Sequence, residues 1–178
     1  MVVFAVKKVY PFPKETLKEY FMCFKVWGLG MPYKEVQIEP KEKNIWDWKI
    51  RDNIDFIVLK WNFEHKFTSI QVEHENHLSV NFKNSNHIKK FDGSIDFKEK
   101  QDPETKKFKC LVEFKIRKLK LKDPLLNRLR DPFIGIMKAD YKRFLNNVYE
   151  IIMDKEIRKK VLEECWWVEK SRIDYQGS

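Results

Sequence analysis

The clearest pattern of hydrophobic and polar positions lies in Phe108–Leu121. Its first half alternates apolar with mostly charged residues, which is typical of a β-strand with one buried and one solvent-exposed face. The phase then changes at Arg117–Lys118, because Leu119 and Leu121 would otherwise lie among the charged residues. The pattern therefore predicts one long strand with a β-bulge at Arg117–Lys118.

A long amphipathic helix is predicted after this strand, over Asp131–Met153. The pairs Asp123-Pro124 and Asp131-Pro132 each place Asp at an N-cap and Pro at the first helical position. Apolar residues then recur at steps of three and four and form one stripe: Ile134, Met137, Tyr141, Phe144, Leu145, Val148 and Ile152. So wide a stripe needs a broad apolar surface, and we expect that surface to be the concave face of a sheet.

The preceding part of the chain is predicted to supply this sheet. Val2–Tyr10 has a strand pattern, Lys14–Val26 has a helical pattern, and Trp27–Pro32 is interpreted as a loop. Further strand-like segments follow, separated by short polar breaks: Tyr33–Glu39, Ile45–Ile50, Ile54–Glu64, Phe67–Glu73, Leu78–Phe82 and Phe91–Lys100. The predicted fold class is α+β, with a curved antiparallel sheet of about seven strands gripping the C-terminal helix.

The composition is that of one globular domain. The chain has 178 residues, 43% of them hydrophobic, and no apolar run reaches the roughly 20 residues that span a bilayer. The apolar start Met1–Val6 lacks a preceding basic region, which argues against a signal peptide.

Cys23, Cys110 and Cys165 are odd in number and far apart, so no disulfide framework is expected and a cytoplasmic location is favoured. Few glycines and many Lys, Ile, Phe and Glu fit a thermophilic protein, or merely AT-rich coding.

The positive charge is concentrated in one segment. The net charge is +9, and Lys106–Arg130 holds ten Lys or Arg residues against two acidic ones. One interpretation is a solvated sheet face; the other is docking on an anionic partner, namely nucleic acid, the ribosome or an acidic membrane surface. The candidate docking residues are Lys115, Arg117, Lys118, Lys120, Lys122, Arg128 and Arg130. The strand has no interleaved aromatic residues for base stacking, which disfavours sequence-specific RNA reading.

The sequence carries no recognisable catalytic or metal-binding motif. His74 and His77 are three residues apart, but in a strand-turn setting we do not expect them to share a face as a helical zinc pair does. Phosphate-binding glycine loops, nucleophile elbows and Cys-x-x-Cys pairs are absent from the sequence. We therefore expect no metal, no cofactor and, on balance, no enzymatic activity.

The order of predicted elements resembles the START-like (SRPBCC, helix-grip) superfamily. Val9–Leu17 is similar to the end of its first strand and its first small helix, and Gly93–Phe97 with Phe108–Leu121 is similar to its last two strands. Phe133–Met153 resembles its terminal helix. The resemblance covers residues 1–153 as a START-like domain and leaves 154–178 as a C-terminal extension. The loop predicted at Trp27–Pro32 departs from the superfamily, which usually has a second short helix there.

The resemblance implies a cavity between sheet and helix that binds a hydrophobic small molecule such as a fatty acid or lipid. The residues predicted to face it are Trp48, Leu59, Trp61, Ile70, Phe82, Phe97, Val112, Phe114, Met137, Tyr141 and Phe144. The same large side chains could also fill the space completely. In the extension, Trp166-Trp167 is predicted either to cover the domain or to dock on a partner or membrane. The oligomeric state is left open.

Overall fold

The computed structural model describes the chain except for residues 1, 57–58 and 166–178. Within the described residues, seven strands form one antiparallel sheet in the order β1-β7-β6-β5-β4-β3-β2. Consecutive strands are neighbours from β2 to β7, and β1 closes the far edge against β7. The predicted α+β class and the seven-stranded antiparallel sheet are confirmed.

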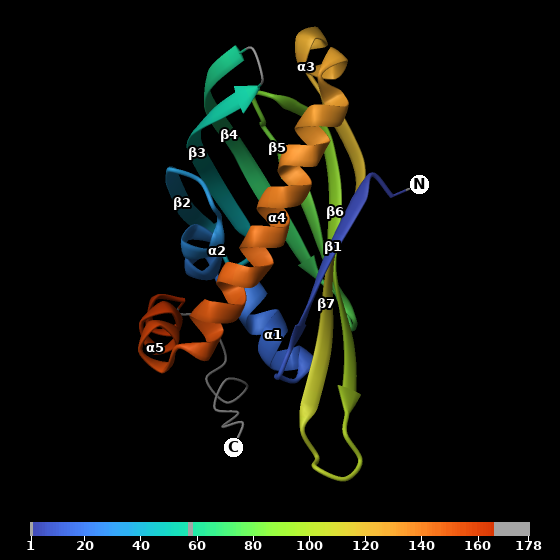
Figure 1. Ribbon diagram of the computed structural model, residues 1–178. Helices are drawn as coiled ribbons and strands as arrows, with labels where there is room; N and C mark the ends of the chain where they lie inside the picture. The colour runs from blue at the N-terminus through green and yellow to red at the C-terminus, as the bar shows by residue number, and fades with distance from the viewer. Residues whose placement is uncertain (1, 57–58, 166–178) are drawn as a thin grey trace.

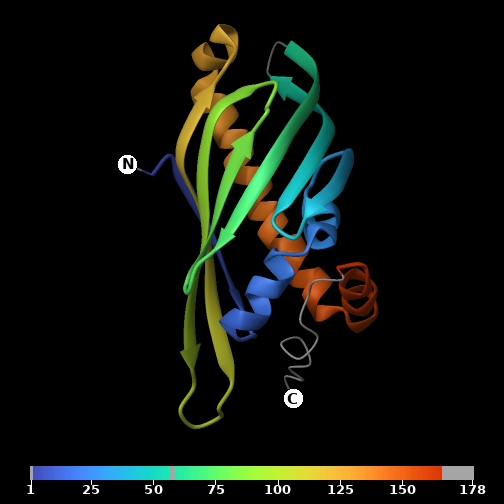
Figure 2. The same ribbon diagram turned by 180° about the vertical axis from the view of Figure 1, so that it is seen from behind.

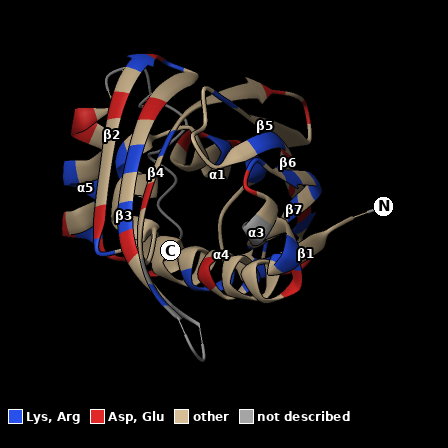
Figure 3. Cartoon of the chain, turned by 90° about the horizontal axis from the view of Figure 1, so that it is seen from above, with Lys and Arg blue, Asp and Glu red and all other residues tan. Residues whose placement is uncertain are grey.

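The strands are long, because apolar and polar residues alternate over long stretches. Their bounds are β1 Phe4–Tyr10, β2 Glu35–Glu42, β3 Ile45–Phe56, β4 Leu59–Glu73, β5 His77–Lys83, β6 Ile88–Gln101 and β7 Phe108–Leu121. The sheet curves strongly, so that its edge strands β1 and β2 lie on either side of the long helix when seen from above (Figure 3).

The helices of the described residues lie on the concave side of the sheet and at its ends. Their bounds are α1 Lys14–Phe21, α2 Phe24–Gly30, α3 Pro124–Arg128, α4 Arg130–Met153 and α5 Lys155–Glu164. Helix α4 crosses the concave face, with α1 and α2 beside its C-terminal half (Figures 1 and 2). Its buried residues include most of the predicted stripe: Met137, Tyr141, Phe144, Leu145, Val148 and Ile152. The sheet therefore grips α4 as predicted.

The β-bulge lies where the change of phase predicts it. Asp92 and Gly93 are consecutive in β6 but pair with Lys118 and Ile116 of β7, so Arg117 is the extra residue. The inserted residue keeps the following leucines of β7 on the buried face.

The loop predicted at Trp27–Pro32 is wrong, because most of it belongs to α2. Packing explains why two glycines are tolerated in this helix. A Cβ atom on Gly30 would lie 2.9 Å from the Phe144 ring, so glycine permits the close approach of α2 to α4. The side-chain amide of Asn147 donates a hydrogen bond to the Gly30 carbonyl at 2.8 Å and caps the helix end. The short helix removes the departure from the START-like element order.

Two predicted strand breaks are also wrong. Residues 51–53 lie inside β3, and residues 65–66 lie inside β4. The pairing of β4 with both neighbours is continuous, so its alternation never changes phase. Phe63, His65, Phe67, Ser69 and Gln71 therefore face inward, and all five are buried. Ile70, which was predicted to face inward, lies on the opposite face of the strand and is only half-buried.

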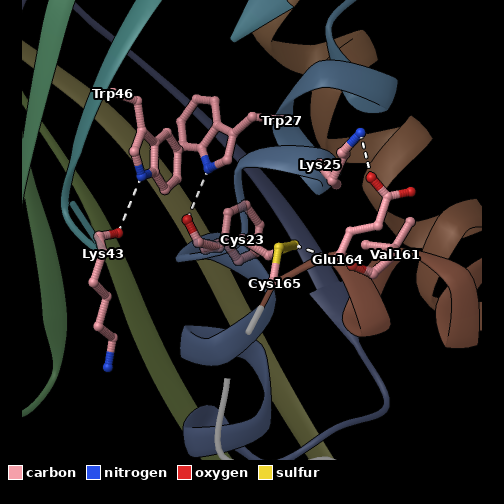
Figure 4. Close-up of a disulfide and its surroundings, with 9 residues drawn as sticks. Cys23, Lys25, Trp27, Lys43, Trp46, Val161, Glu164 and Cys165 are labelled. Carbon is pink, nitrogen blue, oxygen red and sulfur yellow. Dashed lines mark hydrogen bonds and ion pairs between the residues drawn. A yellow bond between two sulfur atoms is a disulfide. The ribbon is translucent and has the colours of Figure 1, made fainter. Parts of the chain in front are cut away.

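The expectation of no disulfide is wrong as well. Cys23 and Cys165 are 142 residues apart in sequence, but their Cα atoms are 5.8 Å apart and their sulfur atoms are bonded (Figure 4). The wide spacing in the sequence argued against this bond, but α5 folds back beside α2 and brings Cys165 next to Cys23. An ion pair between Lys25 and Glu164 accompanies the bond, and Cys110 is buried and free.

The start of the C-terminal extension forms α5, whose first turn is capped by Asp154. Its carboxylate accepts hydrogen bonds from the backbone N–H groups of Glu156 and Ile157 at 2.9 and 3.0 Å. Trp166-Trp167 lies outside the described residues. Among the described residues, no helix combines the length and the apolar character needed to cross a membrane.

Candidate ligand cavity

A cavity of about 480 Å³ lies between the concave face of the sheet and α4. It is lined from the sheet by Trp48, Ile50, Asp52, Asn53, Ile54, Phe63, His65, Phe67, Ser69, Gln71, Val80, Phe82 and Ile88, and from the helical side by Trp27, Met31, Pro32, Tyr33, Phe133, Ile136, Met137, Asp140, Tyr141 and Arg143. This volume is within the range of small-molecule sites.

The cavity occupies one half of the concave face. Over β6 and β7, helices α1 and α2 fill the space with aromatic side chains. The Phe21 ring contacts those of Phe97 and Phe144, with centroids 5.8 and 6.1 Å apart. The Trp27 indole stacks on Phe144 at 4.5 Å. The cavity remains over β3, β4 and β5, where α2 borders it through Trp27 and α1 contributes no lining residue.

Aromatic rings form a continuous wall along the sheet side of the cavity. Trp48 stacks on Phe67 with centroids 5.3 Å apart, and Phe67 contacts Phe82 at 4.2 Å. Phe82 stacks in turn on Phe91 at 3.8 Å. Cross-strand neighbours on one face bring these rings together, since Trp48 pairs with Phe67 and Ser69 pairs with Phe82. The wall suits the flat or chain-like apolar body of a small molecule.

Neutral polar groups from β4 interrupt this wall. The His65 imidazole shares a hydrogen bond with the Ser85 hydroxyl at 2.8 Å. Burial, with the His87 charge as a lesser cause, lowers the pKa of His65 to about 3, so the ring is neutral at physiological pH. The Trp48 indole N–H donates to the Ser69 hydroxyl at 2.8 Å. Neither the nitrogen nor the oxygen of the Gln71 amide has a partner among the described residues.

Charged groups gather at one rim of the cavity, between β3 and α4. Asp52, Asp140 and Arg143 lie there with Tyr33 and the exposed Asn53. Burial raises the pKa of the Asp140 carboxyl to about 6, with Arg143 opposing and Asp52 adding to the rise. Burial also raises the pKa of the Tyr33 hydroxyl, which therefore stays neutral.

The predicted ligand-binding residues fall into several groups. Trp48, Phe82, Met137 and Tyr141 line the cavity. Phe97, Val112, Phe114 and Phe144 are buried in the filled half of the core. Ile70 is on the outer face of β4, and the side chains of Leu59 and Trp61 lie outside the described part of the chain. Contact of any of them with a ligand remains a prediction.

Several lining residues were missed by the sequence reasoning. The most important are His65, Phe67, Ser69 and Gln71, because the false break in β4 restarted the alternation on the wrong residue. If the alternation that places Phe63 inward is continued through residues 65–66 without a break, it places all four residues on the inner face. No sequence pattern indicates that Asp140 and Arg143 border the cavity, because their position at its rim depends on how β3 approaches α4.

The basic side chains of Lys106–Arg130 have different surroundings in the structure. Lys115 pairs with Asp96 at 2.5 Å and with Glu113 at 3.1 Å, and Arg117 donates a hydrogen bond to Ser94 at 3.0 Å. A separate hollow, the basic hollow, lies where β6 and β7 meet the start of α4. It is lined by Lys90, Arg117, Lys118, Lys120 and Arg130 together with Val2, Val3, Leu119, Asp131 and Ile134. Lys122 and Arg128 are exposed but do not line it.

The two histidines of the β4–β5 turn lie together, contrary to the sequence-based argument. The rings of His74 and His77 stack with centroids 4.2 Å apart, and the His74 ring shares a hydrogen bond with Ser79 at 3.1 Å. Across the described ranges, however, no three or more His, Cys, Asp or Glu residues are grouped so as to hold a metal ion.

Comparison with known proteins supports the fold alone. No family model matches the chain, and no curated protein matches it in sequence. A crystal structure of a protein from Thermus thermophilus matches with a TM-score of 0.54 and 13% identity, covering 90% of this chain and 97% of that one. The di-domain ARO/CYC protein StfQ of the steffimycin biosynthetic pathway matches with a TM-score of 0.54 and 11% identity over 88% of this chain and 51% of StfQ.

A START superfamily protein from Mycobacterium smegmatis also matches, with a TM-score of 0.41 and 13% identity over 90% of this chain and 94% of that one. The sheet order, the gripped terminal helix and the two matches with TM-scores of 0.54 together give this protein the helix-grip fold. The chain spans about half of the two-domain StfQ.

Proposed function

We propose that the protein binds a hydrophobic small molecule in the cavity between the sheet and α4, without catalysing a reaction on it. The observation that carries this proposal is the cavity of about 480 Å³, walled by the rings of Trp48, Phe67 and Phe82. Because folded proteins pack their interiors closely, an apolar hollow of this size is a candidate binding site.

The test begins with the protein as purified, analysed by native mass spectrometry and organic extraction. A bound mass that appears as a hydrophobic compound in the extract would support the proposal. A cavity-filling variant sharpens the result. Val80→Phe places a ring into the cavity from a residue that is 2% exposed. We expect it to fold and to purify without the compound.

Val72→Phe is the matched control, because it makes the same change on the outer face of β4, where Val72 is 44% exposed. This variant should retain the compound. Equal loss from both variants, or a compound that Val80→Phe does not displace, would contradict binding in the cavity.

A second candidate function is docking on an anionic macromolecule or acidic membrane surface through the basic hollow. The supporting observation is that five basic side chains line it against one acidic side chain, that of Asp131. The two functions are compatible, since the hollow and the cavity share no lining residue.

The proposed setting is the cytoplasm of a heat-adapted organism, where disulfides such as Cys23–Cys165 persist.

A further inference from the structure

Gln71 presents an unsatisfied amide to the ligand cavity. The side chain is 1% exposed and borders the cavity. Among the described residues, neither polar atom of its amide has a hydrogen-bond partner. Natural structures satisfy nearly all buried polar groups, because an unpaired one is costly. An additional group is therefore expected to complete this amide.

The local structure fixes Gln71 in this position. Its backbone N–H donates to the Asn44 carbonyl at 2.9 Å, and its carbonyl accepts from the Asn44 side chain at 3.2 Å. The backbone is thus fully bonded, and only the side chain is left unsatisfied. The residue opposite it on β5 is the apolar Val80. Ser69, the next inward residue of β4, already accepts a hydrogen bond from Trp48.

The end of the cavity around Gln71 is neutral. The charged lining residues gather around Asp52, which pairs with Phe63 near the start of β4. Gln71 lies eight residues further along the same strand, about 26 Å away at the usual rise of a β-strand. The polar groups between these ends are Ser69 and the neutral ring of His65. No cationic side chain lines this end of the cavity, and the buried Lys18, which lies outside the lining, is already paired with Glu73 at 3.7 Å. Burying a ligand carboxylate against Gln71 would therefore be unfavourable.

We propose that the ligand carries an uncharged hydroxyl or carbonyl group that hydrogen-bonds to the side-chain amide of Gln71, while its apolar body lies against Trp48, Phe67 and Phe82. The amide suits either group, because it offers both a donor and an acceptor. The ligand class is therefore a ring compound whose hydroxyl or carbonyl group lies at the Gln71 end of the cavity, rather than a fatty acid whose carboxylate lies there. This inference rests on the proposed function.

The experiment compares 2-naphthol with naphthalene, which have the same ring system with and without a hydroxyl group. Binding of each probe is measured by isothermal titration calorimetry on the delipidated full chain. We expect 2-naphthol to bind the unmodified protein about tenfold more tightly, the effect of one buried hydrogen bond. Gln71→Met keeps the length of the side chain but removes the amide, so it should reduce the preference to about twofold or less without weakening naphthalene.

The matched control is Gln37→Met, which makes the same change at an exposed strand residue outside the cavity. It should behave as the unmodified protein. Equal affinity for the two probes, or a preference that survives Gln71→Met, would overturn the inference while leaving the proposed function standing. Binding of neither probe would count against the proposed function itself. A marked fall in the melting temperature of ligand-free Gln71→Met would show that the protein already satisfies the amide, and would also overturn the inference.

Discussion

The ring of Phe114 on β7 stacks on the ring of Tyr141 on α4, with centroids 4.2 Å apart and an interplanar angle of 18°. Phe114 is fully buried, and Trp27 of α2 contacts it from a third element, with centroids 6.3 Å apart. Tyr141 also lines the ligand cavity. The pair therefore stands at the boundary between the filled and the hollow halves of the core.

The change Phe114→Asp is expected to unfold the protein or destabilise it strongly. It removes a ring packed among other aromatic rings and buries a carboxylate in their place, which costs several kcal/mol, on the order of the whole stability of a domain. Thermal unfolding followed by circular dichroism measures the effect. Lys109→Asp, at an exposed position of the same strand, is the control and should change the melting temperature little. An unchanged melting temperature for Phe114→Asp would show that the described register of β7 is wrong.

Two glycines should respond to alanine in opposite directions. A Cβ atom on Gly30 would meet the Phe144 ring at 2.9 Å and Val148 at 3.1 Å, so Gly30→Ala should lower stability by about 1–3 kcal/mol through overpacking between α2 and α4. Gly135 lies in α4 with open space around its Cβ position, so Gly135→Ala should raise stability by about 0.5–1 kcal/mol through the better helix propensity of alanine. Chemical denaturation of the two variants side by side tests both signs, and two changes of the same sign would refute the packing described for α2.

The disulfide is expected to stabilise the fold. Cross-linking Cys23 to Cys165 closes a loop of 142 residues, for which the chain-entropy model gives about 4–5 kcal/mol. Reduction should therefore lower the melting temperature markedly and free the end of α5 from α2. The double variant Cys23→Ala/Cys165→Ala serves as the control and should be insensitive to reductant. A thiol assay on the denatured, unreduced protein should count one free thiol, that of Cys110, and a count of three would rule the disulfide out.

The sequence predicted the elements with strong periodicity and missed those decided by distant contacts. The alternation in β7 was regular enough to reveal even the bulge at Arg117, because one slip moves every later side chain to the other face. The stripe of α4 likewise required a wide apolar partner, and the sheet supplies it. Helix α2 gave no such signal, since its glycines favour a loop locally and only the Phe144 ring explains them.

The cavity was predicted only in outline for the same reason. The inward phase of β4 passes through His65, which together with Lys66 imitates a break between strands, and then through the polar Ser69 and Gln71, which made Ile70 a better candidate for the inner face. Local sequence cannot distinguish a polar cavity wall from a polar turn, because both are interruptions in an apolar pattern. Which half of the concave face is hollow depends on where α1 and α2 place Phe21 and Trp27, and that is a property of the tertiary structure.

Asp140 should make the stability of the protein depend on pH at the rim of the cavity. Its folded pKa of about 6 lies above the ordinary value of 3.8, chiefly because burial disfavours the charged carboxylate. A carboxyl group whose pKa is raised by folding lowers the free energy of unfolding wherever the unfolded chain would be ionised. This penalty is fully present above pH 6 and disappears as the pH falls below about 4. Because Asp140 is partly solvated, we discount the penalty to about 1 kcal/mol.

Asp140→Asn removes this penalty, so the variant should be more stable than the unmodified protein at pH 7.5, and the difference should shrink toward pH 4. Melting temperatures of the two proteins, measured in parallel over this range, give the difference directly, because the other titrating groups are common to both. A difference that is independent of pH, or that grows on acidification, would mean that the Asp140 carboxyl has an ordinary or lowered pKa.

The basic hollow is tested by reversing the charge of two facing lysines. Lys90 and Lys120 are exposed, pair across β6 and β7, and both line the hollow. The double variant Lys90→Glu/Lys120→Glu should therefore elute from heparin at a clearly lower salt concentration. Its binding to a polyanion should depend less steeply on salt, by about two units of the logarithmic slope for two lost contacts.

Lys100→Glu/Lys109→Glu is the matched control, because these lysines also pair across β6 and β7, are exposed, and lie outside the hollow. The two double variants have the same net charge, so a general electrostatic effect would weaken heparin binding equally in both. A selective loss in the hollow variant would locate the anionic partner there. Equal losses of heparin affinity would instead indicate that the lysines of β6 and β7 form a solvated face, whose charge prevents the sheet from associating with other chains.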